Sequence, residues 1–190
     1  TMDHITGGRV ILAPGSGWFA AEAKAYDFKE WSDDGLERIA RLDEGLDIYR
    51  GLIECEDENG FSYDGRFYQL KDAFCYPKPE QKPYPPIWVG GDAPGTFKRV
   101  LRYGDGWIPS LGGNETPNLL KLDRMAELRE LAKAEGRAPF PIITNATPRD
   151  PAAIEQLAEA GVMRCLFGFK AAPADDVLRR LDQLAHLLDL

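Results

Sequence analysis

A double glycine, Gly90-Gly91, is the feature of this sequence that most directly indicates chemistry. It follows a short apolar run, Ile87 to Val89, of the kind that forms a buried strand, and it precedes a stretch with helical spacing of its apolar residues. Backbone N–H groups at the start of a helix beyond a strand attract anions, and phosphate is the usual guest. An ordinary strand-to-helix connection is the alternative interpretation. The residues expected at the anion site are Gly90, Gly91, Asp92, Ala93 and Thr96.

The helix predicted beyond this turn has an apolar side that begins at Phe97, and Gly104 is placed to end it. We expect Asp92 or Ala93 to cap the helix, with Pro94 in the first turn, where a missing N–H costs nothing. Asp92 is unfavourable in an anion site because its side chain is itself negatively charged. Its carboxylate would repel phosphate unless it faces away to cap the helix.

A second glycine-rich turn, Gly15-Ser16-Gly17-Trp18, follows another apolar run, Val10 to Ala13. This run is predicted to be a strand that is too apolar on both faces for a half-solvated sheet. We expect the two glycine turns to face one common opening. Trp18 would then stack near a bound ring or form a wall of the pocket, and plain packing is the alternative.

Composition excludes several classes of function. The 190 residues carry a formal net charge of −8, which argues against nonspecific binding to nucleic acid or anionic membranes. No apolar run approaches the roughly 18 residues that span a bilayer, and no signal peptide is visible. Two histidines exclude a His-rich metal site, and three cysteines without CxxC spacing indicate a reducing compartment. We therefore expect a cytoplasmic protein.

Strands and helices are predicted to alternate along the chain. A helix is expected from Asp34, with Glu37 completing a capping box, to about residue 54. Phe61-Ser62-Tyr63 and Arg66-Phe67-Tyr68 flank Asp64-Gly65 and predict a hairpin with a two-residue turn. The further predicted strands are 87–89, the run through Trp107-Ile108, 141–144 and 162–167, and the further helices open at Thr116-Pro117, Asp150-Pro151 and Pro173, the last containing Val177, Leu181, Leu184 and Leu188.

This order predicts an α/β fold with a parallel sheet and helices outside it. Five β/α units are visible, whereas a closed (β/α)8 barrel needs eight and about 250 residues are typical. A doubly wound sheet can be built from five β/α units, so the order of elements does not decide between a doubly wound sheet and a barrel.

Several short sequence motifs, taken together, resemble those of the luciferase-like monooxygenase family, the bacterial luciferase superfamily of (β/α)8 flavin and deazaflavin enzymes. Within this family, the motifs are most similar to those of the oxidoreductases that use coenzyme F-420. The motifs are Asp3-His4-Ile5-Thr6-Gly7-Gly8-Arg9, Gly15-Ser16-Gly17-Trp18, Tyr63-Asp64-Gly65-Arg66-Phe67-Tyr68, Pro77-Lys78-Pro79, Pro85-Pro86-Ile87-Trp88-Val89-Gly90-Gly91 and Tyr103-Gly104-Asp105-Gly106-Trp107.

The resemblance implies a TIM-barrel type of fold in which residues 1–190, as a single domain, supply strands four to eight and a small hairpin insertion. The first three β/α units would be missing. Open sheet edges would then require a second copy of the chain or a complementing N-terminal segment, or leave the chain marginally stable.

The resemblance also implies a cofactor, coenzyme F-420 or FMN, held by Gly15, Ser16, Gly17 and Trp18 at one strand end and by Gly90, Gly91, Asp92, Ala93 and Thr96 at the next. Some flavin-using relatives place an arginine at the position of Ser16, and some deazaflavin-using dehydrogenases a glutamate at that of Trp18. This chain has neither, so no catalytic residue is assigned.

Other residues of reactive type are expected in structural roles. Lys170, just past the last predicted strand, sits where a barrel enzyme carries an anion-binding or Schiff-base lysine, and a solvated loop lysine is the interpretation we favour. The remaining ones are Cys165 as a buried small hydrophobe, His4 at a helix end, His186 on the final helix, and Asp105 and Trp107 in turn and barrel packing.

Three functions stay open. The first is a flavin- or F-420-dependent oxidoreductase or monooxygenase acting on a small organic substrate. The second is a non-catalytic partial barrel that serves as a cofactor- or partner-binding subunit. The third is a different phosphate-binding α/β enzyme, such as an aldolase or isomerase.

Overall fold

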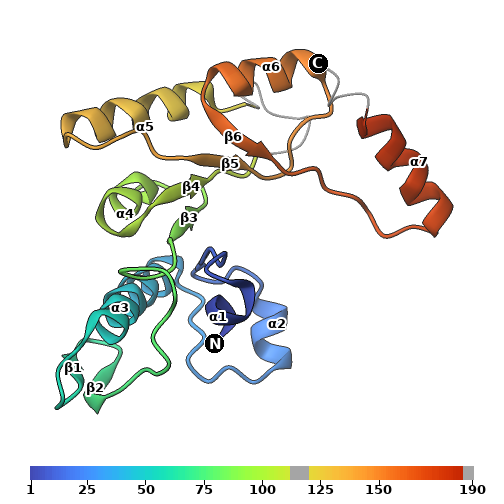
Figure 1. The fold of residues 1–190 in the computed structure, drawn as a ribbon. Coiled ribbons are helices and arrows are strands. Elements are labelled where there is room, and N and C mark those ends of the chain that lie inside the picture. The colour runs from blue at the N-terminus through green and yellow to red at the C-terminus, as the bar shows by residue number, and fades with distance from the viewer. Residues whose placement is uncertain (112–119, 186–190) are drawn as a thin grey trace. The chain divides into compact units, whose positions relative to one another are not determined.

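The computed structural model describes residues 1–111 and 120–185 (Figure 1). The chain divides into two compact units, Thr1–Trp88 and Val89–Leu190, and each is described by itself. The single domain expected over 1–190 stays a prediction. The helix start expected at Thr116-Pro117 and the placements of His186 and Leu188 lie outside the described residues.

The first unit is built around one long helix and a hairpin. The helix α1, Met2–Thr6, ends at Gly7, which has a left-handed φ of 63° that suits glycine. The helix α2, Ala20–Ala25, was not predicted; it has no side-chain cap and buries only Ala23. The remaining elements are α3 (Gly35–Glu54), β1 (Phe61–Asp64) and β2 (Gln69–Ala73).

The start of α3 is confirmed, although its capping box is not. The Asp34 carboxylate accepts a hydrogen bond from the Leu36 N–H at 2.8 Å. The reciprocal bond is absent because Glu37 instead binds Arg41, with 3.0 Å between its Oε1 and the guanidinium Nη2. The Asp34 N–H donates to the Ser32 hydroxyl at 3.2 Å.

The hairpin β1–β2 exists, but the two-residue turn predicted for it is wrong. Asp64 pairs with Gln69, so residues 65–68 form the turn and Arg66-Phe67-Tyr68 is not a strand. The cause lies 22 residues earlier in the chain. The Glu44 carboxylate on α3 accepts hydrogen bonds from the N–H groups of Arg66, Phe67 and Tyr68 at 3.0, 3.0 and 3.2 Å, which removes these donors from the ladder.

The strand predicted over 10–13 is reduced to a single parallel bridge between Leu12 and Ile87. The Leu12 N–H donates to the Pro86 carbonyl, and the Trp88 N–H donates to the Leu12 carbonyl, both at 2.8 Å. Burial on both faces is wrong as well, since Ile11 is 42% exposed. Among the described residues this segment pairs on one side only, so it behaves as an edge.

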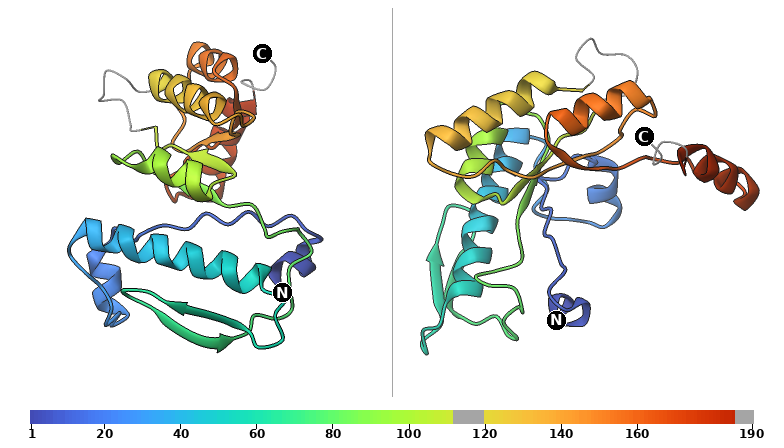
Figure 2. Two further views of the ribbon diagram at one scale, coloured as in Figure 1. Left: turned by 90° about the vertical axis from the view of Figure 1, so that its left-hand side faces the viewer. Right: turned by 45° about the horizontal axis from the view of Figure 1, so that its top comes forward.

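The second unit contains a sheet with the strand order β3-β4-β5-β6. The β4–β5 and β5–β6 pairs are parallel, which confirms an α/β fold with a parallel sheet. Figures 1 and 2 show α5 and α6 side by side along one face of this sheet. The elements are β3 (Trp88–Gly90), α4 (Thr96–Tyr103), β4 (Gly106–Ile108), α5 (Leu122–Ala134), β5 (Ile142–Thr144), α6 (Pro151–Glu159), β6 (Val162–Cys165) and α7 (Ala174–Ala185).

Local capping signals predicted α6 correctly and α4 less well. The Asp150 carboxylate accepts from the Ala153 N–H at 3.0 Å, with Pro151 at the helix start. At α4, by contrast, neither Asp92 nor Ala93 is the cap. The helix begins later, at Thr96, and its cap is Gly95 with φ 88°, which places Pro94 before the helix. Gly104 ends α4 as expected.

Trp107 lies at the centre of the second unit and confirms its predicted packing role. It is fully buried, and its ring meets Phe97 edge-on with 4.9 Å between the ring centres. Its Nε1–H donates to the Gly91 carbonyl at 2.9 Å. The core side chain therefore also holds the turn that follows β3.

The far edge of the sheet is less buried than predicted. Cys165 is half-buried rather than inside an apolar core, and it lines an apolar pocket of about 450 Å³ with α6 and α7 side chains. Helix α7 buries none of its described residues. Exposed apolar side chains on β6 and α7 include Met163, Leu178 and Leu181.

Asp3 connects α1 to the proline-rich loop at residues 76–86 of the first unit. It is 4% exposed, and its carboxylate accepts from the Gln81 backbone N–H at 2.9 Å and from the Gln81 Nε2 at 2.8 Å. The Gln81 N–H, as the largest cause, holds the pKa of Asp3 below its ordinary value of 3.8, although burial opposes this shift.

Because the pKa of Asp3 is lower in the folded state, its contribution to stability is present above the unfolded value and is lost as pH falls through the folded value. We expect Asp3→Asn to be less stable than the parent at neutral pH and to approach it only as the pH falls below 3.8. Urea midpoints of both proteins across this range test the expectation. A stability gap that stays constant with pH would contradict it.

Candidate functional site

The double-glycine turn of the second unit is an open loop that leads into a helix without a side-chain cap. Gly91 has a φ of 95°, which favours glycine, and a Cβ atom built on Gly90 or Gly91 meets no atom of the described residues within 4 Å. The described part of the chain thus leaves space for a ligand beside both backbones. The structure places Gly90, Gly91, Asp92, Ala93 and Thr96 in this loop and at the first turn of α4.

Not every N–H group of this loop is available to an anion. The Gly91 N–H donates to the Ile108 carbonyl at 3.1 Å, and the Thr96 N–H donates to the Ala93 carbonyl at 3.0 Å. Within the described residues, the Phe97 and Lys98 N–H groups carry no capping side chain. These two donors and the helix dipole remain for an anion.

Asp92 does not cap the helix; it forms an ion pair. Its Oδ2 lies 2.5 Å from the Nζ of Lys121, the residue that precedes α5. The Asp92 side chain is 28% exposed, and its Oδ1 is buried without a hydrogen-bond partner in the described structure. Lys121 thus offsets the negative charge with which Asp92 would repel a phosphate.

The other glycine turn, residues 15–18, lies in the first unit and is held by α3. The Gly17 carbonyl accepts from the Arg38 Nε at 3.2 Å. Gly17 has a φ of 73°, and a Cβ there would lie 3.1 Å from the Trp31 ring. Trp18 is 85% exposed, so packing in the core does not explain it.

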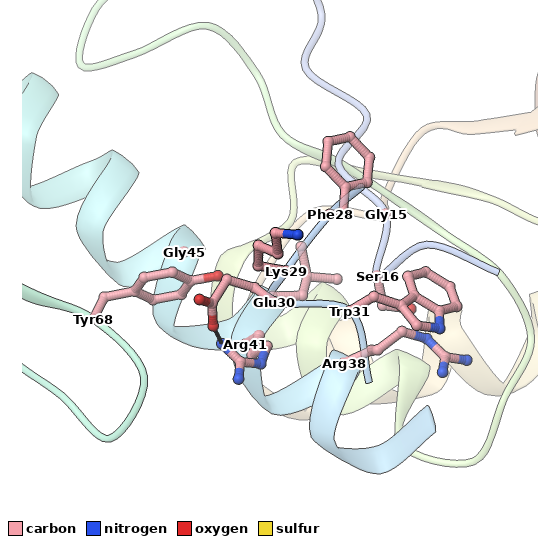
Figure 3. Close-up of a pocket in the computed structure, with 11 residues that line it drawn as sticks. Gly15, Ser16, Phe28, Lys29, Glu30, Trp31, Arg38, Arg41, Gly45 and Tyr68 are labelled. Atoms are coloured by element: carbon pink, nitrogen blue, oxygen red, sulfur yellow. Dashed lines mark hydrogen bonds and ion pairs between the residues drawn. The ribbon is translucent and has the colours of Figure 1, made fainter. Parts of the chain in front are cut away.

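A pocket of about 420 Å³ opens beside this turn, entirely within the first unit (Figure 3). Two predicted residues, Gly15 and Ser16, line it, whereas Gly17 and Trp18 do not. The pocket lies within the usual size range of ligand sites. Besides Ser16, half of the side chains that line it are apolar or aromatic and half are charged, with three cations and one carboxylate: Phe28, Trp31, Leu42 and Tyr68 against Lys29, Arg38, Arg41 and Glu30.

The two arginines of this pocket have different surroundings. Arg41 pairs with Glu37 at 3.0 Å and with Glu30 at 3.4 Å. Burial lowers the pKa of Arg41, but hydrogen bonding and charge from Glu37, with help from Tyr68 and Glu30, outweigh it and raise the pKa above its ordinary value. Arg38 instead binds backbone carbonyls and stacks on Trp31, with its Cζ 4.7 Å from the ring centre.

Sequence reasoning missed Lys121, Arg38 and Arg41 as site residues. Lys121 is separated from Asp92 by 28 intervening positions, and no local pattern indicates that the two meet. Arg38 and Arg41 follow the expected spacing of α3, but nothing in the sequence shows that they reach the turn at residues 15–17.

The other candidate residues take structural or solvated positions. Lys170 is exposed, as the favoured interpretation predicts. His4, near the end of α1, is exposed, and its Nε2 lies 2.6 Å from the Lys78 carbonyl, so it contacts a distant loop. Across residues 1–111 and 120–185, no cluster of His, Cys, Asp and Glu is suited to a metal ion, and no helix is long and apolar enough to cross a membrane.

Comparisons of the sequence and the fold with known proteins identify the family of this chain. An uncharacterized protein of Mycobacterium tuberculosis (strain H37Rv) is 33% identical over 99% of this chain and 62% of its own length. The FMNH2-dependent dimethylsulfone monooxygenase of Pseudomonas putida is 30% identical over 73% of the chain and 36% of its own length. The F-420-dependent glucose-6-phosphate dehydrogenase of Amycolatopsis mediterranei is 37% identical over 59% of the chain and 32% of its own length.

Solved structures agree in fold. The monooxygenase RslO1 from Streptomyces bottropensis superposes with a TM-score of 0.63 at 21% identity, over 99% of this chain and 59% of RslO1. The chain thus spans about three-fifths of the length of the Mycobacterium tuberculosis relative and of RslO1, and its matches to the Pseudomonas putida and Amycolatopsis mediterranei enzymes span about one third of theirs. The family model for luciferase-like monooxygenases matches residues 1–183. This chain belongs to the luciferase-like monooxygenase family.

Proposed function

We propose that this chain is a flavin- or F-420-dependent oxidoreductase of the monooxygenase type that acts on a small organic substrate. The observation that carries the proposal is the loop at residues 90–96, where open glycine backbones lead to an uncapped helix start and Lys121 offsets the charge of Asp92. Relatives that depend on FMNH2 or F-420 support this choice of cofactor. Family membership makes an aldolase or isomerase an unsupported alternative.

The loop fits the phosphate group that both cofactors carry. Gly90, Gly91, Asp92, Ala93 and Thr96, with the N–H groups at the start of α4, would hold it. Gly15, Ser16, Gly17 and Trp18 are proposed to contact the cofactor at a second turn. The cofactor would supply hydride transfer or oxygen insertion, and the chain would bind, orient and exclude water. Closure of the (β/α)8 barrel and a cytoplasmic location stay predictions.

Two substitutions with opposite expected effects test the loop. Lys121→Gln leaves the Asp92 carboxylate uncompensated beside a phosphate, so we expect FMN and F-420 to bind about tenfold more weakly. Asp92→Asn removes that charge and leaves the lysine free, so we expect tighter binding. Titration of each cofactor, followed by absorbance and fluorescence, measures both effects.

The double variant Lys121→Gln/Asp92→Asn serves as the control, because it removes the ion pair without leaving a charge. We expect its affinity to return close to that of the parent. Equal losses in all three variants would show that the ion pair matters only for folding. If neither FMN nor F-420 binds to the parent chain, the proposed cofactor is wrong.

A second candidate function is a partial barrel without catalysis that binds a cofactor or partner. The exposed apolar residues of β6 and α7 at the edge of the sheet favour it. A second copy or a complementing segment would cover such an edge. Cofactor binding without turnover supports this candidate, whereas a stable monomer by analytical ultracentrifugation counts against the need for a covering partner.

A further inference from the structure

We infer that the pocket of the first unit is a binding site for a small aromatic carboxylate, with Arg38 as the residue that binds the carboxylate group. The site shares Gly15 and Ser16 with the proposed cofactor site, but its argument uses only first-unit residues and holds whether or not a cofactor binds.

Charge distinguishes Arg38 from the other cations that line the pocket. Arg41 is neutralised by Glu37 and Glu30. Lys29 pairs with Asp27 at 2.5 Å, and both side chains are about three-quarters exposed. Arg38 has no carboxylate partner among the residues that the structure describes; its guanidinium donates to the Gly17 and Ser32 carbonyls. The Arg38 end of the pocket therefore carries a cation that no carboxylate contacts directly among the described residues.

Three aromatic side chains line the pocket, which favours a ligand that itself carries a ring. Phe28, Trp31 and Tyr68 are drawn around it in Figure 3, and they come from the segment before α3 and from the hairpin turn. Aromatic side chains favour offset or edge-on contact with another ring. Two carboxylates, Glu30 and Glu37, lie at the Arg41 end. The bound molecule should therefore carry one anionic group, directed toward Arg38, and an uncharged ring toward Tyr68.

Arg38 is held in place before any ligand arrives. Its Nε donates to the Gly17 carbonyl at 3.2 Å and its Nη1 to the Ser32 carbonyl at 2.6 Å. Its guanidinium also lies over the Trp31 ring, whose Nε1–H donates to Asp33 at 3.0 Å. A planar guanidinium fixed in this way loses little conformational freedom on binding a carboxylate.

The four tryptophan indole N–H signals in a 15N-labelled sample provide the test. We expect 2-naphthoate to bind saturably and to shift the Trp31 signal, while the Trp107 signal in the second unit stays in place. The neutral 2-naphthamide should bind at least tenfold more weakly, and naphthalene-2,6-dicarboxylate no more tightly than the monoacid. Equal affinities for acid and amide, or a shift confined to Trp107, would overturn the inference.

Variants assign the charge to Arg38. Arg38→Gln should reduce 2-naphthoate affinity to the level of the amide, whereas Lys24→Gln, which removes one positive charge from an exposed position on α2 outside the pocket lining, should stay within twofold of the parent. Equal losses in both variants would overturn the assignment. The acid–amide comparison on the parent chain stands even if Arg38→Gln fails to fold. Naphthoate binding without FMN or F-420 binding would leave this site intact and reject the proposed function.

Discussion

Replacing Glu44 with glutamine is expected to lower the free energy of unfolding of the first unit by about 2 kcal/mol. The carboxylate accepts three backbone hydrogen bonds, from Arg66, Phe67 and Tyr68. Hydrogen bonds to a charged acceptor are stronger than neutral ones, and an amide offers a single acceptor oxygen in place of two. Partial exposure of the turn lets water replace some of the loss, which keeps the expected cost moderate.

Urea unfolding measures the total cost, and hydrogen exchange of the amides at 66–68 locates it. Glu54→Gln is the matched control, since Glu54 ends the same helix, is exposed and contributes no capping bond. We expect the control to stay within about 0.5 kcal/mol of the parent. Unchanged protection of the three amides in Glu44→Gln would show that the carboxylate does not hold the turn.

The same turn shows why the fold was only partly predictable. Asp34 and Asp150 were recognised as caps because the donor of each hydrogen bond lies two or three residues away. The alternating aromatic residues around Asp64-Gly65 also predicted a hairpin correctly. Its turn length was wrong, because a carboxylate more than 20 residues earlier takes the N–H groups that a two-residue turn would place in the ladder.

The candidate site was also predictable only in part: its local signals could be read from the sequence, and its distant partners could not. Glycines after apolar runs are local signals, and the structure shows Gly91 and Gly17 with positive φ values. Charged partners come from distant elements: Lys121 reaches Asp92, and Arg38 reaches the Gly17 carbonyl. Sequence spacing carries no information on such meetings unless the packing of the helices is already known.

Trp107 is where packing and the proposed site are coupled, so its replacement has the largest expected effect. Trp107→Ala removes a fully buried ring that contacts Phe97, and we expect it to lower the free energy of unfolding by about 3–5 kcal/mol. Trp107→Phe keeps an aromatic ring but deletes the donor to the Gly91 carbonyl. We expect a smaller loss, about 1–2 kcal/mol, from the missing hydrogen bond and the reduced volume.

The phenylalanine variant separates stability from function. Without the Nε1–H bond the Gly91 carbonyl is released, so the double-glycine turn should sample more conformations and bind FMN or F-420 several-fold more weakly at a temperature where the variant is folded. Thermal melting and cofactor titration measure the two effects separately. Trp18→Phe, at an exposed position, controls for stability and should melt like the parent. Parental cofactor affinity in a folded Trp107→Phe would mean that the turn is preorganised by its own backbone, through the Gly91 N–H bond to Ile108, rather than by the core beneath it.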